Sequence, residues 1–202
     1  MKLYAFALAT LLPWSLPCFG AGPDANKGKT AGNPSAPILL EVYSDFMCPH
    51  CKTFHETMLP NLIRDYVTTG KAYLVNREYP LNIPQHVYSR QAAEFATAAA
   101  RVGKYQAVSD ALFRSQASWG MTGKVWETVA GALSPDEQKK VQALATDPAV
   151  KAEVQRDVDA AQKARLSQTP TLLITHRLKQ QPWTFFDDYS LLRGYLDDLL
   201  KK

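Results

Sequence analysis

The C-P-H-C motif at residues 48–51 constrains this chain more than any other feature, because it joins a strand pattern to a helix pattern. Residues 38–43 are apolar except for one glutamate, as in a strand covered on both faces, and a helical pattern follows over residues 48–69. Cys48 would begin this helix, where unpaired N–H groups and the helix dipole stabilise a thiolate. Cys51 falls one turn later on the same face, so the two can close a disulfide.

The two residues inside the motif favour a reactive thiolate at Cys48. Pro49 suits the first helical turn, where its missing N–H costs nothing. His50 supplies positive charge when protonated, or a donor when neutral, and either lowers the pKa of Cys48. A lower thiol pKa favours the reduced form, so such a disulfide is readily transferred to the thiols of another molecule. The candidate catalytic residues are therefore Pro49, His50 and the two cysteines.

A bare C-x-x-C motif has two other interpretations, half of a zinc site and an inert structural disulfide. Zinc would need two further ligands, and the sequence has no second C-x-x-C and no paired histidine motif. Its four histidines are scattered. We therefore predict no metal and no bound cofactor, and redox chemistry is the favoured interpretation.

The first twenty residues predict a signal peptide. A lysine precedes an apolar run at residues 3–12, and small residues allow cleavage after Gly20 or Ala21. A membrane anchor is the alternative, although the run is short for a span. Cleavage removes Cys18 and leaves the motif's two cysteines alone in the periplasm, where disulfides persist.

The rest of the chain predicts an α/β fold in the order β-α-β, an all-helical insertion, and β-β-α. Its 202 residues, 46% of them hydrophobic, can form a core plus a lobe, and a net charge of +4 is too mild to indicate nucleic-acid binding. Residues 21–37, rich in Gly, Pro, Asn and Lys, predict a flexible linker. Residues 38–84 and 166–202 supply the strand-rich halves, and residues 85–165 form the insertion with five helices.

Several details of the strand-rich halves can be tested. The apolar strand at 38–43 should lie centrally, parallel to a strand at 72–79 because βαβ crossovers are right-handed. Pro60 should kink the helix after the motif without dividing it. Residues 171–175 and 183–186 predict a hairpin that precedes the last helix.

Thr169-Pro170, at the start of a strand, is the second candidate site. A proline is tolerated there because an opening position does not need its N–H. The residues alone favour an ordinary trans bond, and a cis bond, which costs little before proline, is the alternative.

Three features together resemble the DsbA-like branch of the thioredoxin superfamily. They are V-Y-S-D-F-M-C-P-H-C at residues 42–51, T-P-T at 169–171, and the inserted helices. The resemblance covers roughly residues 32–200. Three further segments support it, namely G-N-P-S-A-P at 32–37, R-E-Y-P-L at 77–81 and F-R-S-Q-A-S-W at 113–119.

The resemblance implies a thioredoxin fold with a helical insertion, residues 38–84 and 166–202 forming the thioredoxin-like domain. It implies that Cys48 is the solvent-facing, attacking cysteine and that Cys51 resolves. It also implies a cis bond between Thr169 and Pro170, packed against the disulfide. The backbone of Thr169 would then pair with an extended substrate segment.

The function that these features predict is a periplasmic thiol–disulfide oxidoreductase, most simply a dithiol oxidase. Its expected partners are exported proteins that contain cysteines and a membrane protein that reoxidises it, and we expect a monomer. One alternative is a reductase or isomerase on the same fold. The other is a peptide-binding chaperone whose cysteines are incidental.

One departure from the superfamily pattern concerns the proton at Cys51. Members often hold a buried acid six residues before the first cysteine, where this chain has Val42. Strand alternation turns the neighbouring Glu41 to the opposite face, so a solvated or ion-paired role is favoured for it over proton relay. Water or Glu78 could supply the proton route instead.

Residues near the motif are further candidates. We expect Phe46 and Met47 to line an apolar groove for substrate peptides, and for Trp119 and Met121 a groove and the core are equally favoured. For His55, one turn beyond Cys51, a solvated helix face is favoured over a part in tuning the site. For His86, at a helix start, a surface or capping role is favoured over a role as a ligand.

Overall fold

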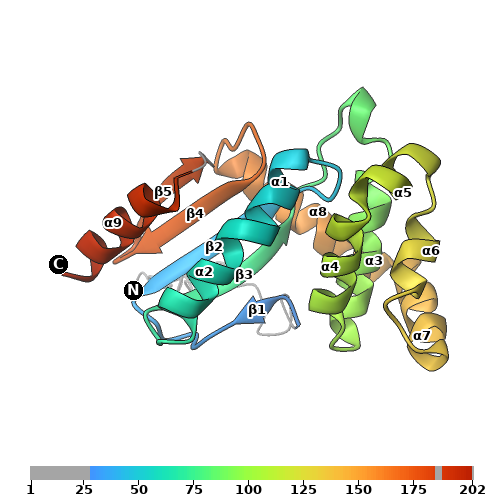
Figure 1. The fold of residues 1–202 in the computed structure, drawn as a ribbon, viewed down its shortest axis with the longest axis horizontal. Coiled ribbons are helices and arrows are strands. Elements are labelled where there is room, and N and C mark those ends of the chain that lie inside the picture. The colour runs from blue at the N-terminus through green and yellow to red at the C-terminus, as the bar shows by residue number, and fades with distance from the viewer. Residues whose placement is uncertain (1–27, 185–187, 202) are drawn as a thin grey trace, which may run out of the picture.

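The computed structural model describes residues 28–184 and 188–201, so the predicted signal peptide lies outside the described residues. A five-stranded sheet in the order β1-β3-β2-β4-β5 forms its centre (Figure 1). The strand β2 lies in the middle, parallel to β3 and antiparallel to β4, as its apolar sequence predicts. The strands are β1 (Thr30–Ala31), β2 (Ile38–Ser44), β3 (Ala72–Glu78), β4 (Thr171–His176) and β5 (Lys179–Thr184).

Helices cover the sheet and build a lobe beside it (Figure 1). A continuous helical run, made of α1 (Pro49–Thr53), η1 (Phe54–Met58), α2 (Leu59–Leu62) and η2 (Ile63–Val67), follows β2. The chain ends on α9 (Tyr189–Leu200). Between β3 and β4 lie η3 (Pro84–His86), α3 (Ser89–Arg101), α4 (Tyr105–Arg114), α5 (Gln116–Thr122), α6 (Val125–Ala130), α7 (Pro135–Ala145) and α8 (Pro148–Lys163).

Pro60 is accommodated inside the helical run without a break. The run widens into a π turn at η1, whose last bond joins the N–H of Leu59 to the carbonyl of Phe54. A π turn skips one residue of the usual ladder, which suits a proline that has no N–H to donate. The prediction of one element rather than two is confirmed.

Two faces of the sheet carry different cores. The helical run and α9 pack on the face that includes Leu40, Leu74 and Ile174. On the other face Tyr43 and Leu173 cluster with residues of α8. The last helix of the predicted insertion therefore also covers the sheet, while α3 to α7 share a separate core with the active-site motif.

The predicted flexible linker is wrong over residues 28–37. This segment forms β1, which pairs antiparallel with β3, and it buries Lys29 completely. Burial is stabilised because two carboxylates meet the lysine ammonium group, a long-range pairing that local composition does not reveal. Residues 21–27 lie outside the described residues.

Two local boundaries differ from the prediction. The helix α5 was not expected, and the strand β5 begins at Lys179 rather than after a longer polar turn. The turn is only Arg177 and Leu178, both with positive φ, as in the tight hairpins that match strand twist. Within the described ranges, no helix has both the length and the apolarity to cross a membrane.

Candidate active site

Cys48 and Cys51 lie at the carboxyl end of β2, where the helical run begins. Cys48 is the N-cap of α1, and its backbone is extended, with φ of −78° and ψ of 120°. Both side chains are free thiols. Cys48 is 6% exposed and Cys51 0%, so the expected solvent-facing cysteine is in fact largely covered. Cys48 is nevertheless the more accessible of the pair, because an N-cap lies at the end of the helix and Cys51 turns into the core.

The cis bond implied between Thr169 and Pro170 is confirmed. The thiol of Cys48 donates a hydrogen bond to the carbonyl oxygen of Thr169 at 3.3 Å. Thr169 and Pro170 are both buried, directly before β4. The structure thus brings the two candidate sites together, although 121 positions separate them in the chain.

The two thiols have opposite acidities. A hydrogen bond from Cys51, with smaller contributions from Thr169 and the N–H groups of Cys51 and His50, lowers the pKa of Cys48 to about 6 against the effect of burial. Burial and the neighbouring Cys48 raise the pKa of Cys51 well above its usual value. A thiolate on Cys48 beside a protonated Cys51 is the arrangement that thiol–disulfide exchange requires.

The two residues inside the motif act through the backbone in this structure. Pro49 occupies the first helical turn, as predicted, and is exposed. His50 is also exposed, and it is its N–H, rather than its imidazole, that contributes to the lowered pKa of Cys48. A catalytic part for the imidazole remains a hypothesis.

The residues expected to line a groove differ in how far they are exposed. Phe46 is 3% exposed and stacks on Phe113 with ring centroids 4.9 Å apart, so its prediction as a groove residue is wrong. Trp119 is likewise in the core, and its indole N–H donates to the carbonyl of Leu112. Met121 is 80% exposed.

Met47 is half-buried beside Cys48, and its sulfur accepts a hydrogen bond from the N–H of Tyr88. Its side chain therefore keeps some surface next to the thiol. A part in binding peptide stays a prediction for Met47.

Asp45 organises the loop before the motif, a role that sequence reasoning missed. Its buried carboxylate accepts hydrogen bonds from the N–H groups of Met47 and Leu81, the hydroxyl of Ser89 and the ring of His86. His86 is therefore not the surface or capping residue that we expected. An aspartate two residues before a backbone N–H is a recurrent turn signal, and it could have been recognised.

Two further side chains make contacts that the sequence did not predict. Gln116, on the unpredicted helix α5, donates to the carbonyls of Phe46 and Cys48 at 2.7 and 3.0 Å. His55 is not on a solvated face, since its Nε2 lies 2.7 Å from Oδ1 of Asp110. Neither contact had a local sequence signal, because each partner lies more than 50 residues away.

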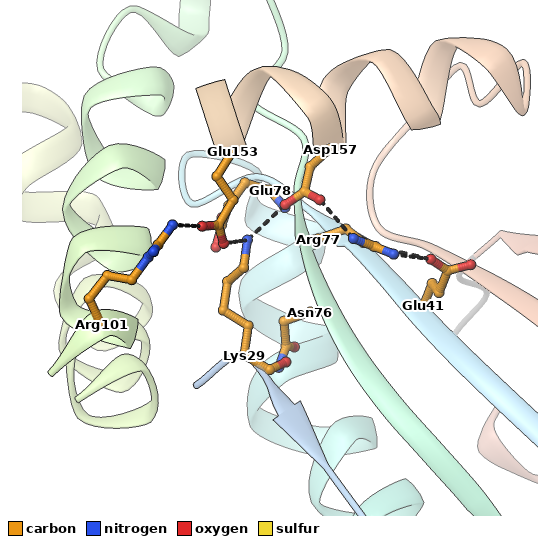
Figure 2. Close-up of polar contacts among 8 residues, drawn as sticks. All are labelled: Lys29, Glu41, Asn76, Arg77, Glu78, Arg101, Glu153 and Asp157. Carbon is orange, nitrogen blue, oxygen red and sulfur yellow. Dashed lines mark hydrogen bonds and ion pairs between the residues drawn. The ribbon is translucent and has the colours of Figure 1, made fainter. Parts of the chain in front are cut away.

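Glu41 is ion-paired, as favoured from the sequence. Its Oε1 accepts from Nη2 of Arg77 at 2.7 Å (Figure 2). Strand alternation places Glu41 on the opposite face of the sheet from Val42, which packs against the helical run that carries Cys51. Val42, at the position where relatives often hold an acid, is buried. The conventional proton route is therefore absent at that position. Among the described residues, no group of three or more His, Cys, Asp or Glu side chains is arranged to hold a metal ion.

A thiol pair that begins a helix and faces a cis-proline beside a central β-strand defines a protein of the thioredoxin superfamily. The Thioredoxin family model matches residues 24–192, and the chain belongs to that family.

Individual relatives agree with this assignment. The chain is 25% identical over 183 residues to a probable disulfide bond formation protein D of Bacillus anthracis, covering 86% of this chain and 79% of that protein. A putative protein-disulfide oxidoreductase of Rickettsia bellii is 26% identical over 117 residues, 54% of this chain, and the match spans only 42% of the Rickettsia protein's own length. The crystal structure of alpha-DsbA1 from Wolbachia pipientis superposes with a TM-score of 0.68 at 22% identity, covering 86% of this chain and 90% of that one.

Proposed function

We propose that this protein is a periplasmic thiol–disulfide oxidoreductase that passes its Cys48–Cys51 disulfide to cysteine-containing exported proteins. The observation that carries the proposal is the opposite acidity of the two thiols at a helix start beside a cis-proline. The names of its relatives and the signal-peptide pattern of residues 1–20 support it.

The reaction starts from the oxidised pair. A substrate thiolate attacks Sγ of Cys48, the Cys48–Cys51 bond breaks, and its electron pair moves to Cys51, which takes up a proton. A second substrate thiolate then attacks the substrate sulfur of the mixed disulfide and releases Cys48 as a thiolate. The substrate is oxidised by two electrons and the enzyme pair is reduced. A pKa of about 6 makes Cys48 a good leaving group in this second step.

The backbone next to Pro170 supplies a docking position for substrate in this proposal. Thr169 presents its carbonyl oxygen to the Cys48 sulfur, so an extended segment that pairs with Thr169 would bring its own cysteine to the same place. Met47, which precedes Cys48 in the chain and is half-buried, is a candidate to contact the bound segment. A membrane redox partner would restore the disulfide after each cycle.

The direct test uses single-cysteine variants and a reduced peptide with two cysteines. Oxidised wild-type protein should convert the peptide to its disulfide form, and Cys48→Ser should not. Cys51→Ala cannot release a partner by intramolecular attack, so it should accumulate a mixed disulfide at Cys48 when mixed with the oxidised peptide. Peptide oxidation by Cys48→Ser at the wild-type rate would show that the roles assigned to Cys48 and Cys51 are wrong.

Two measurements separate the alternatives. A reduction potential close to that of thioredoxin would indicate a reductase instead of an oxidase. A chaperone with incidental cysteines predicts that a variant with both Cys48→Ser and Cys51→Ser still suppresses the aggregation of a test protein as well as wild type does.

A further inference from the structure

A network of charged side chains lies on the side of the sheet that α8 covers, and all of it is buried except parts of Arg77 and Arg101 (Figure 2). We call it the ion cluster and define it by six residues. Three carry positive charge and three negative, so the cluster is electrically balanced. The six are Lys29, Arg77 and Arg101 with Glu41, Glu153 and Asp157.

Each member of the ion cluster meets a partner directly. The ammonium group of Lys29 lies 2.8 Å from Asp157 and 3.2 Å from Glu153. Arg77 bridges Asp157 at 3.0 Å and Glu41 at 2.7 Å. With these pairings made, the cluster has no positive charge to spare.

Glu78 is a buried acid next to the ion cluster that forms none of the ion pairs given above. It is 1% exposed, and its Oε1 has no hydrogen-bond partner among the described residues. Burial raises the pKa of Glu78 to about 8, an effect that Lys29 opposes and that Asp157 and Glu153 reinforce. Glu78 therefore holds a proton at neutral pH, and the exchange reaction as described above does not use it.

The position of Glu78 connects it with Cys51 rather than with the ion cluster alone. In the parallel register, Glu78 of β3 is paired with Ser44 of β2, and paired residues share a face of the sheet. A hydrogen bond from Ser44 makes a small contribution that lowers the pKa of Cys51 against the effect of burial. On the other side, the hydroxyl of Tyr105 hydrogen-bonds the carboxyl group of Glu78.

A small cavity joins these two hydroxyl groups. Ser44 and Tyr105 both line it, together with Asn76 and Ser109, and its volume of about 20 Å³ suits one water molecule. One water molecule in this cavity would complete a series that runs from Glu78 through Tyr105 to Ser44, groups that can each accept and donate a proton. The series ends at Cys51, which is itself sealed from solvent.

We propose that Glu78, acting through Tyr105 and Ser44, holds the proton that Cys51 takes up when its disulfide opens and returns when it closes. On opening, the electron pair of the broken S–S bond makes Cys51 a thiolate, the proton of Glu78 moves to it, and Glu78 becomes a carboxylate that solvent reprotonates. On closing, ionised Glu78 accepts the proton of Cys51 as Cys51 attacks Cys48. The proposal rests on the exchange reaction proposed above.

The test measures the closing step, in which Cys51 displaces a small thiol such as glutathione from a mixed disulfide at Cys48. In wild-type protein the rate should rise with pH through an inflection near 8, where Glu78 ionises. Glu78→Gln keeps the shape but cannot ionise, so that inflection should vanish and the rate above it should fall by about tenfold or more. Tyr105→Phe, which interrupts the series but leaves the acid, should lower the rate in the same direction.

Glu41→Gln is the matched control, because it also neutralises a buried carboxylate, one that belongs to the ion cluster but faces away from Cys51. Its pH profile should match that of wild type. An unchanged rate and inflection in Glu78→Gln would overturn the proposal. If Glu78→Gln does not fold, a wild-type profile in Tyr105→Phe overturns it instead. Failure of wild-type protein to exchange disulfides at all would count against the proposed function, which keeps the two outcomes distinct.

Discussion

The sulfur of Cys48 lies 3.3 Å from the carbonyl oxygen of Thr169, although one belongs to a helix start and the other precedes a strand. Sheet register explains the meeting. In the antiparallel pair of β2 and β4, Tyr43 is opposite Thr171, so the last residues of β2 and the first residues of β4 lie side by side at one end of the sheet. The pairing of β2 with β4 therefore brings the loop after β2 and the cis-proline before β4 together, although the two are far apart in the sequence.

The lowered pKa of Cys48 can be measured by following the ultraviolet absorbance of the thiolate during a pH titration. Reduced wild-type protein should titrate with a pKa of about 6. Cys51→Ala removes the hydrogen bond that contributes most, so its midpoint should move to higher pH. Cys48→Ser should show no step in this range, and a step there would assign the low pKa to another group.

Much of the fold follows from hydrophobic periodicity. The apolar strand at residues 38–43 was expected to be central, and β2 lies in the middle of the sheet because a strand covered on both faces needs apolar side chains on both. The segment before it was misjudged for a physical reason. Gly, Pro and Lys indicate a linker when nothing pairs with them, and the partners that bury Lys29 lie on α8, more than 120 residues later.

Gln116 should stabilise the loop that carries Cys48. Its side-chain amide donates to the carbonyls of Phe46 and Cys48, and it is nearly buried. Gln116→Ala leaves a buried acceptor unpaired, which should lower the free energy of unfolding by about 1–3 kcal/mol. Gln142→Ala, at an exposed position of α7, is the control and should change it by less than about 0.5 kcal/mol. Urea denaturation measures both, and equal effects would contradict a specific role.

In the candidate site, too, local sequence signals identified some residues, and others depend on contacts between distant segments. Cys48 and Cys51 were found because a strand, a short motif and a helix follow one another within a few residues, and Pro170 because a proline opens a predicted strand. The residues that hold them, such as Gln116 and Asp45, act through contacts between segments far apart in the chain. Phe46 was misassigned because adjacency to Cys48 says nothing about burial, which the lobe decides.

Lys29 should contribute strongly to stability, because it is fully buried between two carboxylates. Lys29→Met removes the ammonium group from between Glu153 and Asp157, and leaving buried charge uncompensated typically costs about 3–5 kcal/mol. Lys139→Met removes a lysine whose side chain is 81% exposed and should cost less than about 1 kcal/mol. The measurement is the free energy of unfolding in urea. A small loss for Lys29→Met would mean that the first described segment does not depend on the ion cluster.

The raised pKa of Glu78 also predicts how stability depends on pH. In the unfolded chain this carboxyl ionises near 4.5, whereas in the folded protein it does so near 8. Between these values the folded state binds one more proton at this site, so the contribution of Glu78 falls as pH rises, by roughly 1.4 kcal/mol per pH unit. Above pH 8 both states are ionised and the loss is complete.

Glu78→Gln removes this dependence, so its stability relative to wild type should increase across the window and then level off. Glu56→Gln, an exposed change, should follow the wild-type curve. Urea unfolding of the reduced proteins at several pH values measures the slopes, and parallel curves for Glu78→Gln and wild type would show that Glu78 is ionised in the folded state.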